Sequence, residues 1–105
     1  MKLLIITAVE AFEENVKTIL KESGVLSYSY NKVVGYRDSS LDSIGGNWFA
    51  SELNKDESLL FFAFVTSGVS EKVYENIEQY NKDCDLGSQK HIAISPIEKS
   101  NSIKL

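Results

Sequence analysis

Residues 58–66, with the sequence SLLFFAFVT, are almost continuously apolar and include three phenylalanines. A short run of this kind predicts a strand in a buried sheet. Residues 2–9, KLLIITAV, have the same character. Both runs are apolar at odd and at even positions, whereas an antiparallel strand with one face in water alternates apolar and polar side chains. We therefore expect both faces of this sheet to be covered.

The chain beyond residue 66 predicts a second helix and a last strand. Val69, Val73, Ile77 and Tyr80 recur at helical spacing, and Ser67 or Gly68 is the expected cap. The polar residues 81–90 (NKDCDLGSQK) predict a short loop. Residues 91–97 (HIAISPI) then predict a strand that ends near Pro96.

The chain before residue 58 predicts a first helix and a second strand. From Ala11 the apolar residues fall on one helical face, at Phe12, Val16, Ile19 and Leu20, and Gly24 is the expected stop. Residues 26–36 (LSYSYNKVVGY) begin with strict alternation, which predicts a strand.

Residues 37–57 (RDSSLDSIGGNWFASELNKDE) show no periodicity and are rich in Ser, Asp, Asn and Gly. They predict a loop of roughly twenty residues, longer than the 12–15 residues that loops inside compact domains seldom exceed. Long loops of this kind tend to carry function or to lack order.

The predicted element order is therefore βαββαβ, an α+β fold of ferredoxin-like type. Right-handed crossovers place both helices on one face of a four-stranded antiparallel sheet and leave the other face bare. That face would carry apolar side chains from the first and third strands, and exposing several of them would be costly. We therefore expect the bare faces of several copies to pack together in a closed oligomer.

Composition limits the function classes. A chain of 105 residues with 43% hydrophobic residues has room for one domain with its own core. The net charge of -4 excludes a role that depends on neutralising nucleic-acid phosphates. The single cysteine, Cys84, fits a reducing compartment. The apolar N-terminal run meets acids at Glu10, no run reaches the length of a membrane span, and we expect a cytoplasmic protein with no direct membrane insertion.

The order and spacing of three segments resemble the PII signalling proteins, the trimeric nitrogen regulators. Val33-Val34-Gly35-Tyr36 is similar to the segment before the family's long T-loop, which would here cover about residues 37–57. Residues 85–90 (DLGSQK) occupy the place of the B-loop, and residues 95–98 (SPIE) are similar to the family's last strand. The resemblance spans residues 1–105 and implies a single PII-like domain, a homotrimer and a non-enzymatic regulatory role.

The resemblance also implies that a small ligand binds in the cleft between subunits, with an adenine nucleotide as one candidate. Its candidate ligand-binding residues here are Gly35, Arg37, Gly87, Lys90, His91 and Lys104. The sequence departs from the family in this region. Gly87 is the only glycine of the B-loop, the acids Asp83 and Asp85 flank it, and Ser102 stands where the family has an arginine. An anion other than ATP, such as ADP, AMP or a carboxylate metabolite, is therefore also expected.

The loop at residues 37–57 contains no tyrosine, so control by uridylylation is not expected. It carries Gly45, Gly46, Trp48 and Phe49 instead. An aromatic pair in a glycine-containing loop favours contact with a partner, and packing onto the chain's own domain or a neighbouring subunit is the alternative. By analogy with the family, the expected partner is a membrane transporter or channel.

The main alternative is a metal-responsive trimer that binds divalent cations, similar to the divalent-cation-tolerance proteins. Cys84, Asp85 and His91 are its weak candidate ligands, and they lack the paired spacing of a zinc site. An enzyme that uses the clefts between subunits is a third reading. No nucleophile lies beside a base in the predicted loops, so catalysis is not expected.

Overall fold

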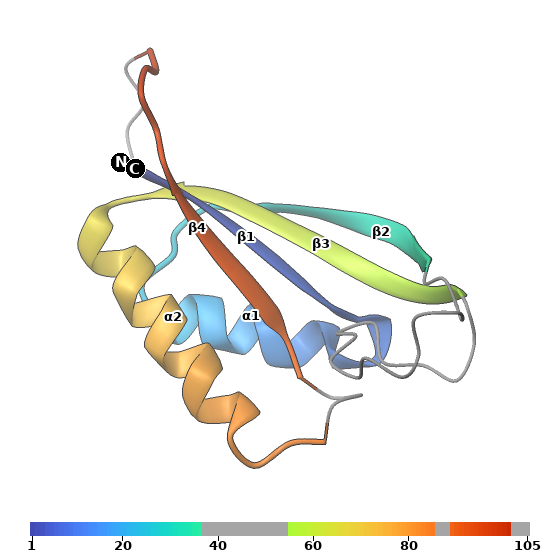
Figure 1. Cartoon of the computed structure of the whole chain (residues 1–105). Helices are drawn as coiled ribbons and strands as arrows, with labels where there is room; N and C mark the ends of the chain where they lie inside the picture. Colours follow the sequence, from blue (N-terminus) through green and yellow to red (C-terminus); the bar gives the residue numbers. More distant parts are fainter. Residues whose placement is uncertain (37–54, 86–88, 102–105) are drawn as a thin grey trace.

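The computed structural model describes residues 1–36, 55–85 and 89–101, with the backbone alone at residues 55 and 56. In chain order the elements are β1 (Lys2–Val9), a 3-10 turn (Glu10–Phe12), α1 (Glu13–Glu22), β2 (Ser29–Tyr36), β3 (Lys55–Val65), α2 (Ser67–Asn81) and β4 (His91–Pro96). The four strands form one antiparallel sheet in the order β2-β3-β1-β4. Both helices lie beneath one face of it (Figure 1). The predicted ferredoxin-like α+β fold is confirmed.

The core lies between the sheet and the helices. Alternate residues of β1 and β3 point toward the helices and are buried, and α1 and α2 contribute one stripe each, as the 3.6-residue period predicts. The core comprises Leu4, Ile6, Ala8, Val16, Leu20, Val25, Leu59, Phe61, Ala63, Val65, Val73 and Ile77.

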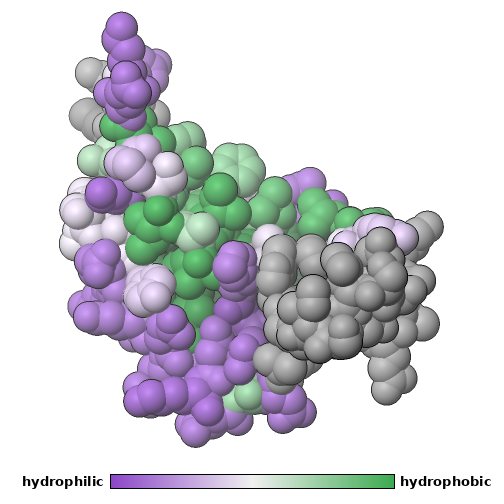
Figure 2. Space-filling model, viewed as in Figure 1, coloured by the Kyte–Doolittle hydropathy of each residue, from purple (hydrophilic) through white to green (hydrophobic). Residues whose placement is uncertain are grey.

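The opposite face of the sheet carries the other half of β1 and β3. Phe62 and Phe64 on this face are 39% and 40% exposed, whereas Phe61 between them and the helices is 1% exposed. Leu3 and Ile5 lie beside them in register. In Figure 2 hydrophobic surface gathers over the sheet, while the helical layer below it is mostly hydrophilic. We call Leu3, Ile5, Leu60, Phe62 and Phe64 the open-face cluster.

Two element boundaries differ from the prediction. The second strand begins at Ser29 rather than residue 26, because residues 26–28 do not pair with β3 although they alternate. The third strand begins at Lys55 rather than residue 58, because its first residues pair with Tyr36, Gly35 and Val34 of β2. The polar run 55–57 therefore belongs to a hairpin and not to the predicted loop.

The helix ends follow local capping rules. Thr66, not Ser67 or Gly68, caps α2, and its side chain accepts a hydrogen bond of 3.3 Å from the Val69 N–H. Gly24 takes a φ of 92° after α1, and its N–H and that of Val25 bond back to the carbonyls of Lys21 and Leu20. This pattern satisfies the last helical carbonyls and requires a left-handed residue. The prediction of Gly24 as the helix stop is confirmed.

Candidate functional site

A pocket of about 250 Å³ lies where residues 24–29 separate from the C-terminal end of β3. The ladder between β2 and β3 ends at the pair Ser29 and Phe62, but β3 continues to Val65, paired on its other side with β1. No backbone hydrogen bond joins residues 24–28 to residues 63–66 of the described chain. The β2-side backbone groups of residues 63–65 therefore face the pocket without a strand partner.

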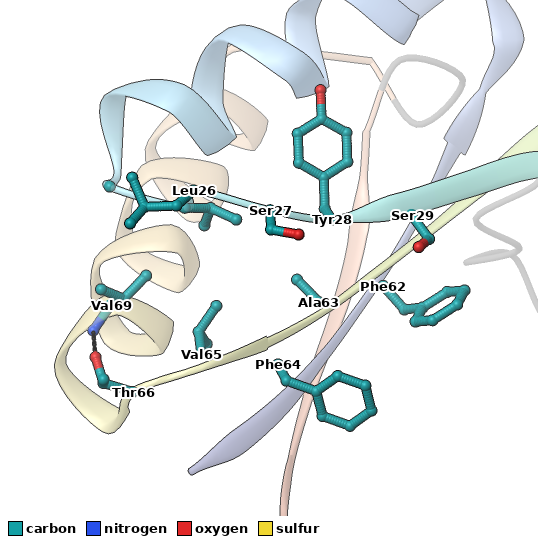
Figure 3. A pocket seen from close by; sticks show the side chains of 12 residues that line it. Leu26, Ser27, Tyr28, Ser29, Phe62, Ala63, Phe64, Val65, Thr66 and Val69 are labelled. Atoms are coloured by element: carbon teal, nitrogen blue, oxygen red, sulfur yellow. Dashed lines mark hydrogen bonds between the residues drawn. The ribbon is translucent and has the colours of Figure 1, made fainter. Parts of the chain in front are cut away.

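The path of residues 24–29 explains why the strand starts late. Gly24 turns the chain back along the sheet, and Val25 is then buried in the core at 7% exposure. Leu26 follows at the rim, 83% exposed. Tyr28 turns toward the helices, and its ring lies 5.9 Å from that of Phe61 (Figure 3). The burial of Val25 and the contact of Tyr28 with Phe61 hold residues 26–28 away from β3.

The walls of the pocket are apolar and uncharged. Ala63, Val65 and Val69 line it, Phe62 and Phe64 flank it on the open face, and none of the twelve lining residues carries a charge (Figure 3). Hydroxyl groups come from Ser27, Ser29 and Thr66, of which Thr66 already accepts a hydrogen bond from the Val69 N–H, whereas the Tyr28 hydroxyl points away toward the helices (Figure 3). Such a site suits a flat, mostly apolar ligand whose edge can exchange hydrogen bonds with a strand backbone and hydroxyls.

An ion-pair network holds β2 on α1 beside this pocket. The Tyr30 hydroxyl donates to Glu13 Oε2 at 3.1 Å, and Lys17 Nζ lies 2.7 Å from the same oxygen and 4.7 Å from the Tyr30 ring centroid. The hydrogen bond from Lys17, followed by that from Tyr30, lowers the pKa of Glu13 below its usual value. The Tyr30 ring also stacks on Phe61 at 5.0 Å. The start of β2 is thus fixed independently of any ligand.

The predicted ligand residues lie at the other end of the sheet. Gly35 is buried near the end of β2, opposite Asp56. It lies six positions along β2 from Ser29, which places it roughly 20 Å from the pocket. His91 starts β4 opposite Thr7 and is exposed on the open face. Arg37, Gly87 and Lys104 lie outside the described residues, as do Ser102 and the loop residues Gly45, Gly46, Trp48 and Phe49.

Lys90, the fourth predicted ligand residue, is buried in the single chain. It is 3% exposed and points into the helical layer. Its Nζ lies 3.3 Å from the Tyr80 ring centroid, 5.0 Å from that of Phe12 and 3.5 Å from Asn15 Oδ1. Among the described ion pairs none involves Lys90. Burial lowers the pKa of Lys90 to about 8.

The backbone of Lys90 is also fixed. The Asn81 side chain accepts from the Lys90 N–H at 2.9 Å and donates to its carbonyl at 2.7 Å. The Gln89 amide donates to the carbonyls of Asn81 and Cys84 at 3.3 and 3.4 Å. These hydrogen bonds therefore join the residues before the predicted B-loop, Asn81 and Cys84, to Gln89 and Lys90 at its end.

The weak metal candidates do not gather into a site. Within residues 1–36, 57–85 and 89–101 no three His, Cys, Asp or Glu side chains come together as metal ligands would. Cys84 donates its thiol hydrogen to the Tyr80 carbonyl at 3.2 Å instead. Over the same part of the chain, neither helix has the length and apolarity needed to cross a bilayer.

The sequence did not indicate the pocket residues. Leu26, Ser27 and Tyr28 alternate as a strand does, and nothing in their own types shows that they leave the sheet. The available signal was Gly24 followed by the apolar Val25 and Leu26, which fits a helix C-terminus with a hydrophobic contact as well as the start of a strand.

Comparisons of sequence with protein-family models and with curated proteins gave no match. Comparison with solved structures gave high similarity. CPII, a nitrogen regulatory PII-like protein from Thiomonas intermedia K12 bound to ADP, AMP and bicarbonate, aligns over 97% of this chain and 94% of its own, with a TM-score of 0.68 and 16% identity. A second CPII structure, bound to ADP and bicarbonate, covers 89% and 81% with a TM-score of 0.62 and 16% identity.

A DUF3240 family protein from Shewanella baltica OS155 aligns over 98% of this chain and 96% of its own, with a TM-score of 0.64 and 13% identity. These structures align over 89–98% of this chain, and at identities of 13–16% the likeness concerns the fold and not the site residues. The chain therefore has the fold of the PII-like proteins.

Proposed function

We propose that this chain is a non-enzymatic PII-like regulatory protein that binds an adenine nucleotide with the base in the pocket between residues 24–29 and the end of β3. The observation that carries the proposal is the unpaired edge of β3 in an uncharged, apolar pocket. A strand edge offers alternating N–H and C=O groups, which complement the donor and acceptor edge of adenine, and the apolar walls accept its faces. The adenine nucleotides bound to CPII are consistent with this ligand class.

The site would be completed by a second copy of the chain. The pocket and the predicted phosphate residues, Gly35 and His91 among them, lie at opposite ends of one sheet, so a single molecule cannot bring them to one nucleotide. A head-to-tail contact repeated round a closed ring would place the pocket of one subunit against the loop end of the next. A homotrimer is the assembly that the family resemblance implies.

The open-face cluster supports such an assembly. Phe62 and Phe64 are each about two-fifths exposed, beside Leu3, Ile5 and Leu60. Full burial of an exposed side chain of this size gains roughly 1.5–3 kcal/mol, so covering the two-fifths of Phe62 and Phe64 that remain exposed would gain a part of that for each ring. The nucleotide would act on residues 37–57, which we propose as the T-loop that contacts a partner. By analogy with the family, the partner is a membrane transporter or channel, which the loop would contact from the cytoplasm.

Thermal shift and calorimetry with AMP, ADP and ATP test this function, with GDP as the control for the base. A nucleotide that binds only the folded form must raise its unfolding temperature. The exposed Ser27→Phe substitution fills the pocket mouth and should abolish the shift, whereas Gln79→Phe on the exposed surface of α2 should leave it intact. Equal responses to ADP and GDP, or binding that survives Ser27→Phe, would refute the pocket.

A further inference from the structure

Thr66 lies at the end of the pocket, where β3 passes into α2. It is one of the residues that line the pocket (Figure 3). Its side chain caps α2 by accepting a hydrogen bond of 3.3 Å from the Val69 N–H, and its carbonyl accepts one of 3.0 Å from the Ser70 N–H. Because the first turn of the helix holds both the side chain and the backbone, the Thr66 hydroxyl has a fixed position at the pocket.

The helix cap also decides how this hydroxyl can bind a ligand. Its oxygen uses one lone pair for the Val69 N–H, and none of the hydrogen bonds among the described residues has the Thr66 hydroxyl as its donor. A hydroxyl oxygen that accepts a hydrogen bond becomes a better donor through its own O–H, because linked hydrogen bonds polarise one another. We therefore expect the Thr66 hydroxyl to favour an acceptor atom of the ligand.

The other hydroxyls at the pocket are less selective. Ser27 and Ser29 are exposed, and within the described part of the chain neither side chain makes a hydrogen bond. A hydroxyl of this kind rotates to serve as donor or as acceptor. The Tyr28 hydroxyl points toward the helices (Figure 3). Thr66 therefore supplies the oriented donor of the pocket.

The hydrogen-bonding groups of adenine complement this arrangement. Its amino group is a donor and its ring nitrogens are acceptors, so a strand edge can bind the amino group through a C=O and one ring nitrogen through an N–H. A further ring nitrogen then still lacks a donor. Thr66 directly follows Val65, the last residue of the unpaired edge, so its hydroxyl is next to the backbone groups that would bind the base.

We propose that Thr66 is a specificity-determining residue of this pocket and donates a hydrogen bond to a ring nitrogen of the adenine base. The inference rests on the proposed function, because it names the side chain that recognises the base in that site. The Thr66 hydroxyl selects bases that present an acceptor to it over bases that present a ring N–H at the same place.

Calorimetry with adenosine and its deaza analogues tests this hydrogen bond. In each analogue a CH group replaces one ring nitrogen, and the uncharged nucleosides avoid any effect of phosphate charge. We expect the analogue that lacks the partner of Thr66 to bind the natural chain about tenfold more weakly than adenosine, as the loss of one hydrogen bond predicts. This difference should vanish in Thr66→Val. Thr18→Val, at an exposed threonine of α1, is the matched control and should keep it.

Thr66→Val also removes the helix cap, so two further variants separate the two roles of Thr66. Serine and aspartate both cap helices well. Thr66→Ser keeps a hydroxyl donor and should keep the difference between adenosine and the analogue. Thr66→Asp only accepts hydrogen bonds at neutral pH and should lose this difference although α2 stays capped. If Thr66→Val does not fold, the comparison of Thr66→Ser with Thr66→Asp decides the test.

The same measurements distinguish failure of this inference from failure of the proposed function. If adenosine does not bind, or binds Ser27→Phe as tightly as the natural chain, the pocket is not the base site and the role of Thr66 is overturned with it. If adenosine binds in the pocket but every difference between adenosine and an analogue is unchanged in Thr66→Val and Thr66→Asp, only the role of Thr66 is overturned.

Discussion

Replacing Lys90 by methionine should stabilise the protein at neutral pH. Lys90 is buried at 3% exposure, and its ammonium donates a hydrogen bond of 3.5 Å to Asn15 Oδ1. Methionine keeps most of the apolar stem that packs between Phe12 and Tyr80 and removes the charge. The substitution therefore isolates the cost of burying the cation.

The magnitude follows from the pKa of Lys90, which burial lowers from 10.5 to about 8. Each unit corresponds to about 1.4 kcal/mol, so the charged form is disfavoured in the folded state by about 3 kcal/mol. Attraction between Nζ and the Tyr80 ring returns about 1–2 kcal/mol, which Lys90→Met also removes. We expect a net gain of about 1–2 kcal/mol, or roughly 5–15 °C in the unfolding temperature of a domain this size.

The pH dependence gives a second signature. Between the folded pKa of about 8 and the unfolded value of 10.5, the unfolded chain binds the proton more tightly. Stability of the natural protein should therefore rise with pH across this window, and below about pH 8 the full cost of the charge is present. The Lys90→Met variant should lack this rise.

Urea unfolding from about pH 7 to pH 9.5 measures both effects. Lys72→Met, an exposed lysine of α2, is the matched control and should change stability little. The comparison is repeated in a Cys84→Ala background, because Cys84 lies beside Tyr80. If Lys90→Met is less stable than the natural protein at pH 7 and the slope with pH is unchanged, the ammonium is net stabilising and the reasoning is wrong.

Three further predictions concern the turn, the sheet face and the network on α1. Gly24→Ala should cost about 1 kcal/mol, because the φ of 92° strains an L-residue while the added Cβ meets Val69 only at 4.0 Å; a loss below a few tenths in denaturant unfolding would contradict this. Phe64→Glu should convert the proposed oligomer to monomer in light scattering, and an unchanged mass would show that this face is not the interface. Glu13→Gln should lower the stability of the protein near neutral pH. The pKa of Glu13 is lower in the folded than in the unfolded chain, so the ionised carboxylate contributes stability above the unfolded pKa, and this contribution is lost as pH falls through the folded pKa. The variant should therefore lose less stability on acidification than the natural protein, and an equal loss in the two proteins would refute the prediction.

The fold was predictable because its signals are local. The apolar runs at residues 2–9 and 58–66 and the helical stripe at Val16 and Leu20 each require only neighbouring residues to be recognised. The sheet order then follows from the few topologies that right-handed crossovers allow. The bare face was predictable for the same reason, since Phe62 and Phe64 alternate with core residues whichever way the sheet is built.

The candidate site was less predictable because it depends on where side chains point after the chain has folded. Lys90 and His91 are adjacent, yet the two-residue period of β4 sends one into the helical layer and the other to the open face. Proximity in sequence to the predicted B-loop therefore could not show that Lys90 is buried, and its role as a ligand residue stays a prediction. Whether Gly35 and His91 serve one ligand stays a prediction, because one chain does not bring them to the pocket.

The sequence alone determined the element order, the helix faces and the left-handed turn at Gly24, because periodicity and backbone sterics act over a few residues. Tertiary structure decided the rest. The pocket exists because Val25 and Tyr28 pack on the core and hold residues 26–28 off β3, and Lys90 is buried only when the helices pack beneath the sheet. Contacts between segments more than thirty residues apart in sequence set both features, and no local pattern encodes them.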